Sequence, residues 1–207
     1  MIRKNVVMGL AGVMLLLWSF NAYSAPDRTG KWDAGVNVSG AIPRDNDTDS
    51  TVYVGGNLAY GVTPWLALGV ESGWMDFGTH LDLGNGVKVD AGDATGVPLL
   101  GDIILRVPIK DSEVTPYGVV GLGAIFWNFD ESNLFKTANI QVDVKTSFAS
   151  KFGGGLDWFV NDHWILNFEA AYVLADADVT AKVGGVSATD TTSADYWTIG
   201  GGVKYLF

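Results

Sequence analysis

The sequence predicts an all-β protein, an eight-stranded antiparallel transmembrane up-and-down β-barrel. The last tract, residues 196–207, places five residues from Trp197 to Phe207 on one parity, with small or polar residues on the other. This is the period of a strand with one apolar face. Seven further tracts alternate in a similar way, and the connections between them are short and long in turn. Aromatic residues bracket three tracts at a spacing of ten, a rise of about 25 Å in a tilted strand.

Residues 1–24 have the pattern of a secretory signal peptide. Arg3 and Lys4 precede an apolar run over 6–20, and small residues follow it as far as Ser24. The run is shorter than the roughly 20 residues that a spanning helix needs. We therefore expect a signal peptide over 1–24 and a single outer-membrane β-barrel domain over 25–207, exported to the outer membrane of a Gram-negative bacterium.

The chain is acidic and contains no cysteine. The formal charge of −10 becomes −12 when Arg3 and Lys4 leave with the signal peptide, which argues against binding nucleic acid. The chain has no cysteine, so an exported domain of this kind needs another source of stability, and a closed barrel in lipid is one.

The eight expected strands follow in order. Their ranges are 32–42, 51–62, 65–76, 95–107, 115–128, 142–160, 164–174 and 196–207. The long connection 77–94 alternates around Gly84-Asn85-Gly86, so strands three and four are expected to continue as a hairpin beyond the membrane. Pro98 and Pro108 suggest a bulge and a strand end.

The fifth expected strand has two possible parities. Val120, Leu122 and Phe126 compete with Tyr117 and Trp127 for the outer face. We favour the first set outward, because Gly121 and Gly123 then leave room inside the barrel.

The connections identify the two ends of the barrel. Those at 63–64, 109–113 and 161–163 are short, whereas those at 43–50, 77–94, 129–141 and 175–194 are long, the last with Gly184-Gly185 at its tip. Short periplasmic turns and longer external loops are typical of outer-membrane barrels. A soluble edge strand or a lipocalin-like barrel would need no aromatic girdles, which we assign to Trp32, Trp65, Trp74, Trp127, Trp158, Trp164 and Trp197.

The inward parity collects charged residues. They are Asp33, Glu71, Asp102, Arg106, Lys151, Asp157, Glu169 and Lys204. Two interpretations stay open: ion pairs that fill a lumen too narrow for bulk water, which we favour, or groups that line a narrow cation-preferring path.

Residues suited to catalysis or to cofactors are few. His163 lies in an expected periplasmic turn, and His80 lies near Asp76 and Asp82 without a nucleophilic serine close in sequence. The glycine triplets at 153–155 and 200–202 lie inside expected strands and precede no helix. We therefore expect neither an enzyme nor a metal or cofactor site.

Two segments resemble known small barrels. The stretch Thr115-Pro116-Tyr117-Gly118 resembles the Pro-Tyr-x-Gly-rich fifth strand of such barrels, and the run from Gly155-Leu156-Asp157-Trp158-Phe159 through Thr180 is similar to the OmpW family. The related opacity and OmpA-like eight-stranded barrels share the Pro-Tyr and terminal Phe features and are the alternative. The alternating tail that ends in Tyr205-x-Phe207 resembles the assembly signal of outer-membrane barrels. The similarity covers the second half of the chain well and the first half at the level of its strands.

The resemblance implies a barrel associated with passage of small, often hydrophobic molecules across the outer membrane. We expect a monomeric barrel, a narrow channel for such solutes, that contacts outer-membrane lipid and lipopolysaccharide and meets the barrel-assembly machinery through Tyr205 and Phe207. The alternative is a sealed structural or adhesive barrel that presents acidic external loops to a partner.

Overall fold

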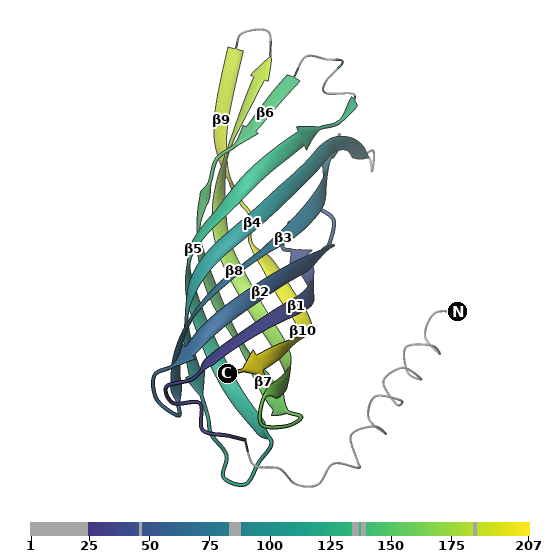
Figure 1. Ribbon diagram of the computed structural model, residues 1–207. Coiled ribbons are helices and arrows are strands. Elements are labelled where there is room, and N and C mark those ends of the chain that lie inside the picture. Colours follow the sequence, from purple (N-terminus) through teal and green to yellow (C-terminus); the bar gives the residue numbers. More distant parts are fainter. Residues whose placement is uncertain (1–24, 46, 83–87, 134–136, 138–139, 184–185) are drawn as a thin grey trace, which may run out of the picture.

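The computed structural model is a closed antiparallel β-barrel (Figure 1). It describes residues 25–45, 47–82, 88–133, 137, 140–183 and 186–207. Three expected features lie outside these residues: the signal peptide, the Gly84-Asn85-Gly86 turn and the Gly184-Gly185 tip.

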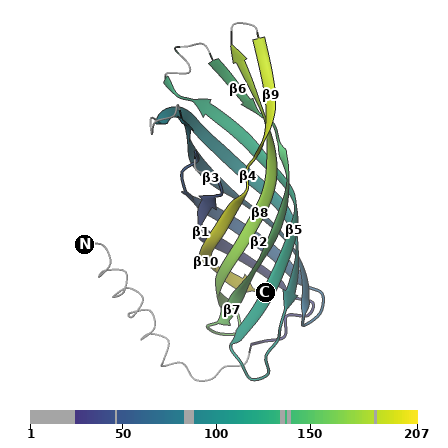
Figure 2. The same cartoon turned by 180° about the vertical axis from the view of Figure 1, so that it is seen from behind.

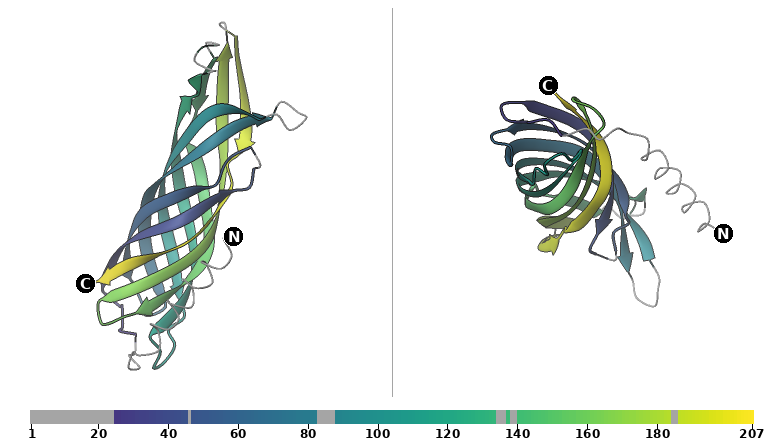
Figure 3. Two further views of the ribbon diagram at one scale, coloured as in Figure 1. Left: turned by 90° about the vertical axis from the view of Figure 1, so that its right-hand side faces the viewer. Right: turned by 90° about the horizontal axis from the view of Figure 1, so that it is seen from below.

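Ten strands make up the eight tracts of the wall. They are β1 (Trp32–Pro43), β2 (Thr51–Gly61), β3 (Leu66–Asp82), β4 (Lys88–Arg106), β5 (Val114–Glu131), β6 (Ile140–Val144), β7 (Ser147–Phe159), β8 (Trp164–Val183), β9 (Val186–Ser193) and β10 (Tyr196–Leu206). Successive tracts pair antiparallel, and the pairing of β10 with β1 closes the barrel. The view along the axis in Figure 3 shows the strands arranged around one centre. The predicted fold class is confirmed.

The two ends of the barrel differ as expected. One end, which we call the turn end, carries the short connections and the C-terminus. At the other, the loop end, β6, β8 and β9 rise above the rest of the wall (Figure 2). Within the described residues, no helix is long and apolar enough to cross a membrane.

The outer face is apolar and the inner face is buried. Val36, Leu68, Ile103 and Phe168 are exposed, whereas their neighbours on the opposite parity point into the barrel. Exposing apolar surface to water costs free energy, so a continuous exposed apolar band indicates a surface that contacts lipid.

The fifth tract follows the parity that we favour. Val120, Leu122 and Phe126 are exposed, and Tyr117 is buried inside. Gly121 leaves room for the Asp102 carboxylate, which would have to move if position 121 carried a Cβ.

The hairpin expected beyond strands three and four is present. β3 and β4 pair out to Asp82 and Lys88, with one register shift between Thr79 and His80. The bulge expected at Pro98 is wrong, because the register of β3 with β4 is the same on both sides of this residue. Proline only omits a ladder bond there, and the Ser72 hydroxyl donates to the Pro98 carbonyl at 2.8 Å. β4 ends at Arg106, before Pro108.

Two other expectations need correction. The tract expected at 142–160 is divided into β6 and β7, because the four residues between Val144 and Ala149 face the three between Val179 and Ala175, which is a β-bulge. The expected loop 175–194 is mostly strand, since β8 continues to Val183 and β9 returns beside it. These residues are too polar to be recognised as strands by an apolar alternation.

Candidate functional site

All eight charged residues that the sequence assigns to the lumen lie on the inward face of the wall. They are Asp33, Glu71, Asp102, Arg106, Lys151, Asp157, Glu169 and Lys204. Six are almost completely buried, while Glu71 and Glu169 are partly buried. The structure brings them together in two ion-pair clusters, one at the turn end and one next to it on its loop-end side.

The lower cluster lies toward the turn end and consists of Arg28, Asp33, Arg106, Asp157 and Lys204. Arg28 Nη1 lies 2.6 Å from Asp157 Oδ2, and Arg106 Nη2 lies 2.7 Å from Asp33 Oδ2. Lys204 Nζ lies 3.1 Å from Asp157 Oδ1. The cluster therefore holds three cations and two carboxylates.

The upper cluster lies above it and consists of Lys151, Glu71, Asp102 and Glu169. Lys151 Nζ lies 2.7 Å from Glu71, 3.2 Å from Asp102 and 3.6 Å from Glu169. One buried ammonium group thus serves three carboxylates, and this cluster has an excess of negative charge.

Two neutral residues connect the clusters. The Tyr117 hydroxyl donates to Glu169 at 2.8 Å and accepts from Asn167 Nδ2 at 2.7 Å. The same Asn167 amide donates to Asp157 at 2.9 Å. The interior is therefore one connected polar network, as buried charges require.

An apolar layer lies on the loop-end side of the upper cluster. Its largest members are Tyr53, Met75, Phe77, Leu100, Ile125 and Tyr196, which are buried and form one cluster. The lumen at this level is occupied by packed apolar side chains.

A cavity of about 150 Å³, which we call the vestibule, lies at the loop end beyond this layer. Phe77, Ala94, Trp127, Ala177 and Tyr196 line it, so its walls are mostly apolar. Such a cavity, apolar with a few polar groups at its rim, is the usual form of a site for a small apolar molecule.

The first loop lies along one side of the vestibule. Thr48 forms a bridge with Thr79 of β3, and the Asp49 N–H donates to the Gly78 carbonyl at 2.8 Å. His80 Nε2 lies 2.8 Å from the Asp49 carboxylate. Asp45 and Thr48 are thereby held at the vestibule wall.

The charged residues outside the barrel are held by short contacts of their own. At the loop end, Thr191 Oγ1 donates to Asp178 at 2.8 Å and, with Lys145 nearby, lowers the pKa of this carboxyl. At the turn end, the Thr29 N–H and hydroxyl donate to Asp27 and lower its pKa below the ordinary value.

Neither histidine belongs to a catalytic arrangement in the described residues. His80 pairs with Asp49 on the surface, and His163 Nδ1 lies 2.8 Å from the Leu206 carbonyl at the turn end. In the part of the chain that the structure describes, no group of three or more His, Cys, Asp or Glu could hold a metal ion.

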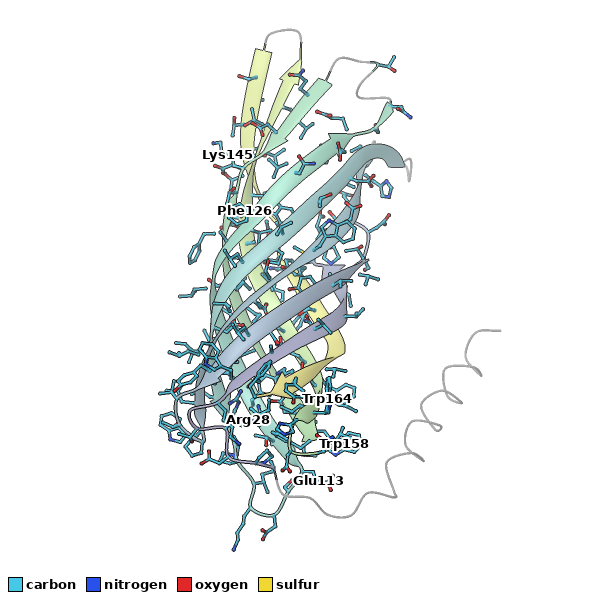
Figure 4. The ribbon with its side chains drawn as sticks, in the orientation of Figure 1. Arg28, Glu113, Phe126, Lys145, Trp158 and Trp164 are labelled. Carbon is cyan, nitrogen blue, oxygen red and sulfur yellow. The ribbon has the colours of Figure 1, made fainter. Side chains whose placement is uncertain are left out.

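Most of the residues assigned to the girdles lie on the outer face. Trp32, Trp65, Trp74, Trp164 and Trp197 are about half exposed, and Trp158 lies partly buried beside Glu113, to which its Nε1 donates at 3.0 Å (Figure 4).

Trp127 is wrongly assigned to a girdle. Its ten-residue spacing from Tyr117 suggested a girdle, but both lie inward, because the outward parity of β5 is that of Phe126. The Trp127 Nε1 donates to Ser147 at 3.0 Å, and the ring packs on the apolar layer.

The expected assembly signal lies at the turn end. The Tyr205 ring lies 5.0 Å from both Trp164 and Phe207, and the Phe207 N–H donates to the Trp32 carbonyl at 2.8 Å. Phe207 itself is exposed. These aromatic side chains are placed where an interfacial belt would lie.

Arg28 is the important lumen residue that strand parity could not reveal. It precedes β1, yet its side chain is buried at the turn end and stacks over Phe159 at 4.5 Å (Figure 4). Gly30 N–H donates to the Gly61 carbonyl at 2.8 Å, and a Cβ at Gly61 would collide with the Arg28 carbonyl. Between the signal peptide and the first strand, the sequence offered only two basic residues, Arg28 and Lys31, and nothing that distinguished them.

Comparison with known proteins identifies the family. A family model described as "outer membrane protein beta-barrel domain" matches residues 12–207. The outer membrane protein AlkL of Ectopseudomonas oleovorans is 26% identical over 231 residues, covering 98% of this chain and 93% of AlkL. Outer membrane protein W of Salmonella typhi is 29% identical over 100 residues, 47% of each protein.

The fold is that of a solved structure. The crystal structure of the outer membrane protein OprG from Pseudomonas aeruginosa is similar with a TM-score of 0.77, covering 87% of this chain and 97% of OprG. The two sequences are 14% identical, so this similarity speaks for the fold alone.

Proposed function

We propose that this protein passes small apolar molecules across the bacterial outer membrane. The chain belongs to the outer membrane protein beta-barrel domain family and is a small barrel of the OmpW and AlkL type. Its place in the outer membrane follows from the family.

The vestibule is the observation that carries this proposal. It lies at the loop end, which in an outer-membrane barrel faces the outside of the cell. Phe77, Trp127 and Tyr196 give it an apolar wall, while Asp45 and Asp195 stand at its margin. A small apolar solute gains free energy on leaving water for such a wall, so the vestibule would collect it.

The interior below the vestibule argues against an open aqueous pore. Packed apolar side chains occupy the lumen at the level of the apolar layer, and ion-paired side chains occupy it at the level of the two clusters. A solute held in the vestibule would therefore leave it when the apolar layer or the wall yields, and ions would pass poorly.

Filling the vestibule tests the proposal. Ala177 lies on β8, is buried and lines the vestibule, so Ala177→Trp would occupy its volume. Ala170 lies on the same strand but on the exposed outer face, so Ala170→Trp is the matched control. We expect Ala177→Trp to abolish most of the uptake of N-phenylnaphthylamine that the parent protein adds in intact Gram-negative cells, whose lipopolysaccharide leaflet slows this probe, while Ala170→Trp leaves uptake at the level of the parent protein. Equal uptake by both variants would contradict the proposal.

A sealed barrel is the second candidate, and the packed lumen favours it. In that case the loop end acts as a binding surface, on which Asp49, Asp178 and Asp190 present negative charge. Cells in which the parent protein adds no uptake of the probe would support this candidate.

The expected partners are part of the proposal. We propose that the apolar outer face contacts lipid and lipopolysaccharide as a monomer, and that Tyr205 and Phe207 are read by the barrel-assembly machinery. Their position on the outer face of the closing strand supports this role.

A further inference from the structure

A second cavity lies at the turn end, opposite the vestibule. Its volume is about 360 Å³, and it is lined by residues of the N-terminal segment and of the connection after β4. Arg28, Arg106 and Lys110 are the cations of its wall, and Asp27 and Asp111 are its carboxylates. The two arginine side chains are at least 97% buried, whereas Lys110 and Asp111 are exposed.

The two arginines have unused hydrogen-bond donors. Arg28 Nη2, Arg106 Nε and Arg106 Nη1 are buried, and none has a hydrogen-bond partner among the described residues. The nitrogens of these two groups that form ion pairs face Asp33 Oδ2, with Arg28 Nη1 at 3.9 Å and Arg106 Nη2 at 2.7 Å. A buried donor without a partner is costly, and more so on a charged group.

The charges of the lower cluster do not balance. Arg28, Arg106 and Lys204 are paired with only Asp33 and Asp157, which leaves one positive charge in excess. Among the described residues, no carboxylate of the upper cluster lies within 4 Å of these three cations, because all three carboxylates converge on Lys151. An excess charge in a dry interior needs a counterion close by.

We propose that the turn-end cavity is a binding site for a small oxyanion, a carboxylate or phosphate group that Arg28 and Arg106 hold together. Its oxygens would accept from the unused donors and neutralise the excess charge. Guanidinium groups suit this task, since their planar fork matches two oxygens of one anion. The site is separate from the vestibule and does not depend on solute passage.

Arginine side-chain NMR tests the site directly. The sequence has four arginines, of which Arg3 lies in the signal peptide, so the processed protein offers Arg28, Arg44 and Arg106. Arg44 is an internal control, because its side chain is 73% exposed at the loop end. In uncharged maltoside micelles, inorganic phosphate is titrated against chloride at constant ionic strength. We expect the Nε–H resonances of Arg28 and Arg106 to shift saturably, while that of Arg44 stays still.

Two variants separate a built site from general electrostatic attraction. Arg28→Lys keeps the charge beside Asp157 but removes the free Nη2, and we expect it to weaken phosphate binding by about tenfold. Lys110→Gln removes an exposed charge from the cavity wall and should change binding less than about twofold. Equal losses in both variants would overturn the proposal, as would a parent protein in which chloride and phosphate act alike or no resonance saturates.

Acetate and a lipid bilayer identify the source of the oxyanion. Saturable binding of acetate or phosphate in micelles supports a soluble ligand. If the same resonances are already shifted in phosphatidylcholine nanodiscs without added phosphate, the oxyanion is a lipid headgroup.

Discussion

Replacing Lys151 by methionine should destabilise the barrel more than any other single loss of a lumen charge. Lys151 is the only cation within 4 Å of Glu71, Asp102 and Glu169 among the described residues. At an effective dielectric constant of about 20, each pair at about 4 Å is worth about 4 kcal/mol before desolvation is subtracted. Breaking one buried pair costs about 3–5 kcal/mol net, so with three carboxylates we expect a loss of about 5 kcal/mol.

The assay is urea unfolding of the protein in lipid vesicles, followed by the heat-modifiable mobility of the folded barrel in gels. Lys145→Met is the matched control, because Lys145 also pairs with an aspartate, Asp178 at 3.5 Å, but on the surface. That variant should unfold at the same urea concentration as the parent protein. Adding Glu71→Gln to Lys151→Met should recover about 1–3 kcal/mol, because one of the three stranded charges is removed.

A small effect would refute this reasoning. If Lys151→Met and Lys145→Met unfold alike, water hydrates the three carboxylates and the lumen is not closed. The cation-preferring path that the sequence left open would then gain support.

Three further predictions concern the ends and the outer face. Deleting Phe207 should reduce the amount of heat-modifiable barrel in outer membranes far more than the amount of protein made, and equal reductions would contradict a role in assembly. Phe168→Arg, in the middle of the exposed face of β8, should lower the free energy of unfolding in lipid vesicles by about 2–4 kcal/mol. Trp164→Arg, near the end of the same strand, should lower it by only about 0–1 kcal/mol through its charge. In a soluble protein the loss would not depend on the position along the strand. Thr191→Val should raise the pKa of Asp178 toward its ordinary value in NMR titrations. Because this pKa is depressed in the folded protein, the contact stabilises the β8–β9 hairpin at neutral pH and is lost as the pH falls through the folded pKa.

The sequence predicted the wall of the barrel because alternation is a local property. Each residue on a strand faces lipid or lumen according to its parity alone, so Leu68, Phe168 and Asp157 could be placed without knowing their neighbours. The polar extensions of β8 and β9 were missed for the same reason, since Asp178 and Thr191 carry no apolar alternation.

The partners inside the lumen could not be predicted from parity. Arg28 and Asp157 are 129 residues apart in the chain, and only the closure of the barrel brings them together. Trp127 shows the opposite failure, because a spacing of ten residues matched a girdle while the parity of its own strand placed it inside. Arg28 lies outside any strand, so no periodicity applied to it.

The wide sequence separation of the lumen ion pairs has a consequence for how the barrel comes apart. Lys151 joins β7 to β3 and β4, and Arg28 joins the N-terminal segment to β7, so these contacts form only after the strands have closed around them. Interactions that are absent from the folding transition state leave the folding rate unchanged and slow unfolding instead. The charges of the lumen would therefore act chiefly on the lifetime of the folded protein, which for a protein at the cell surface is the measure of its durability.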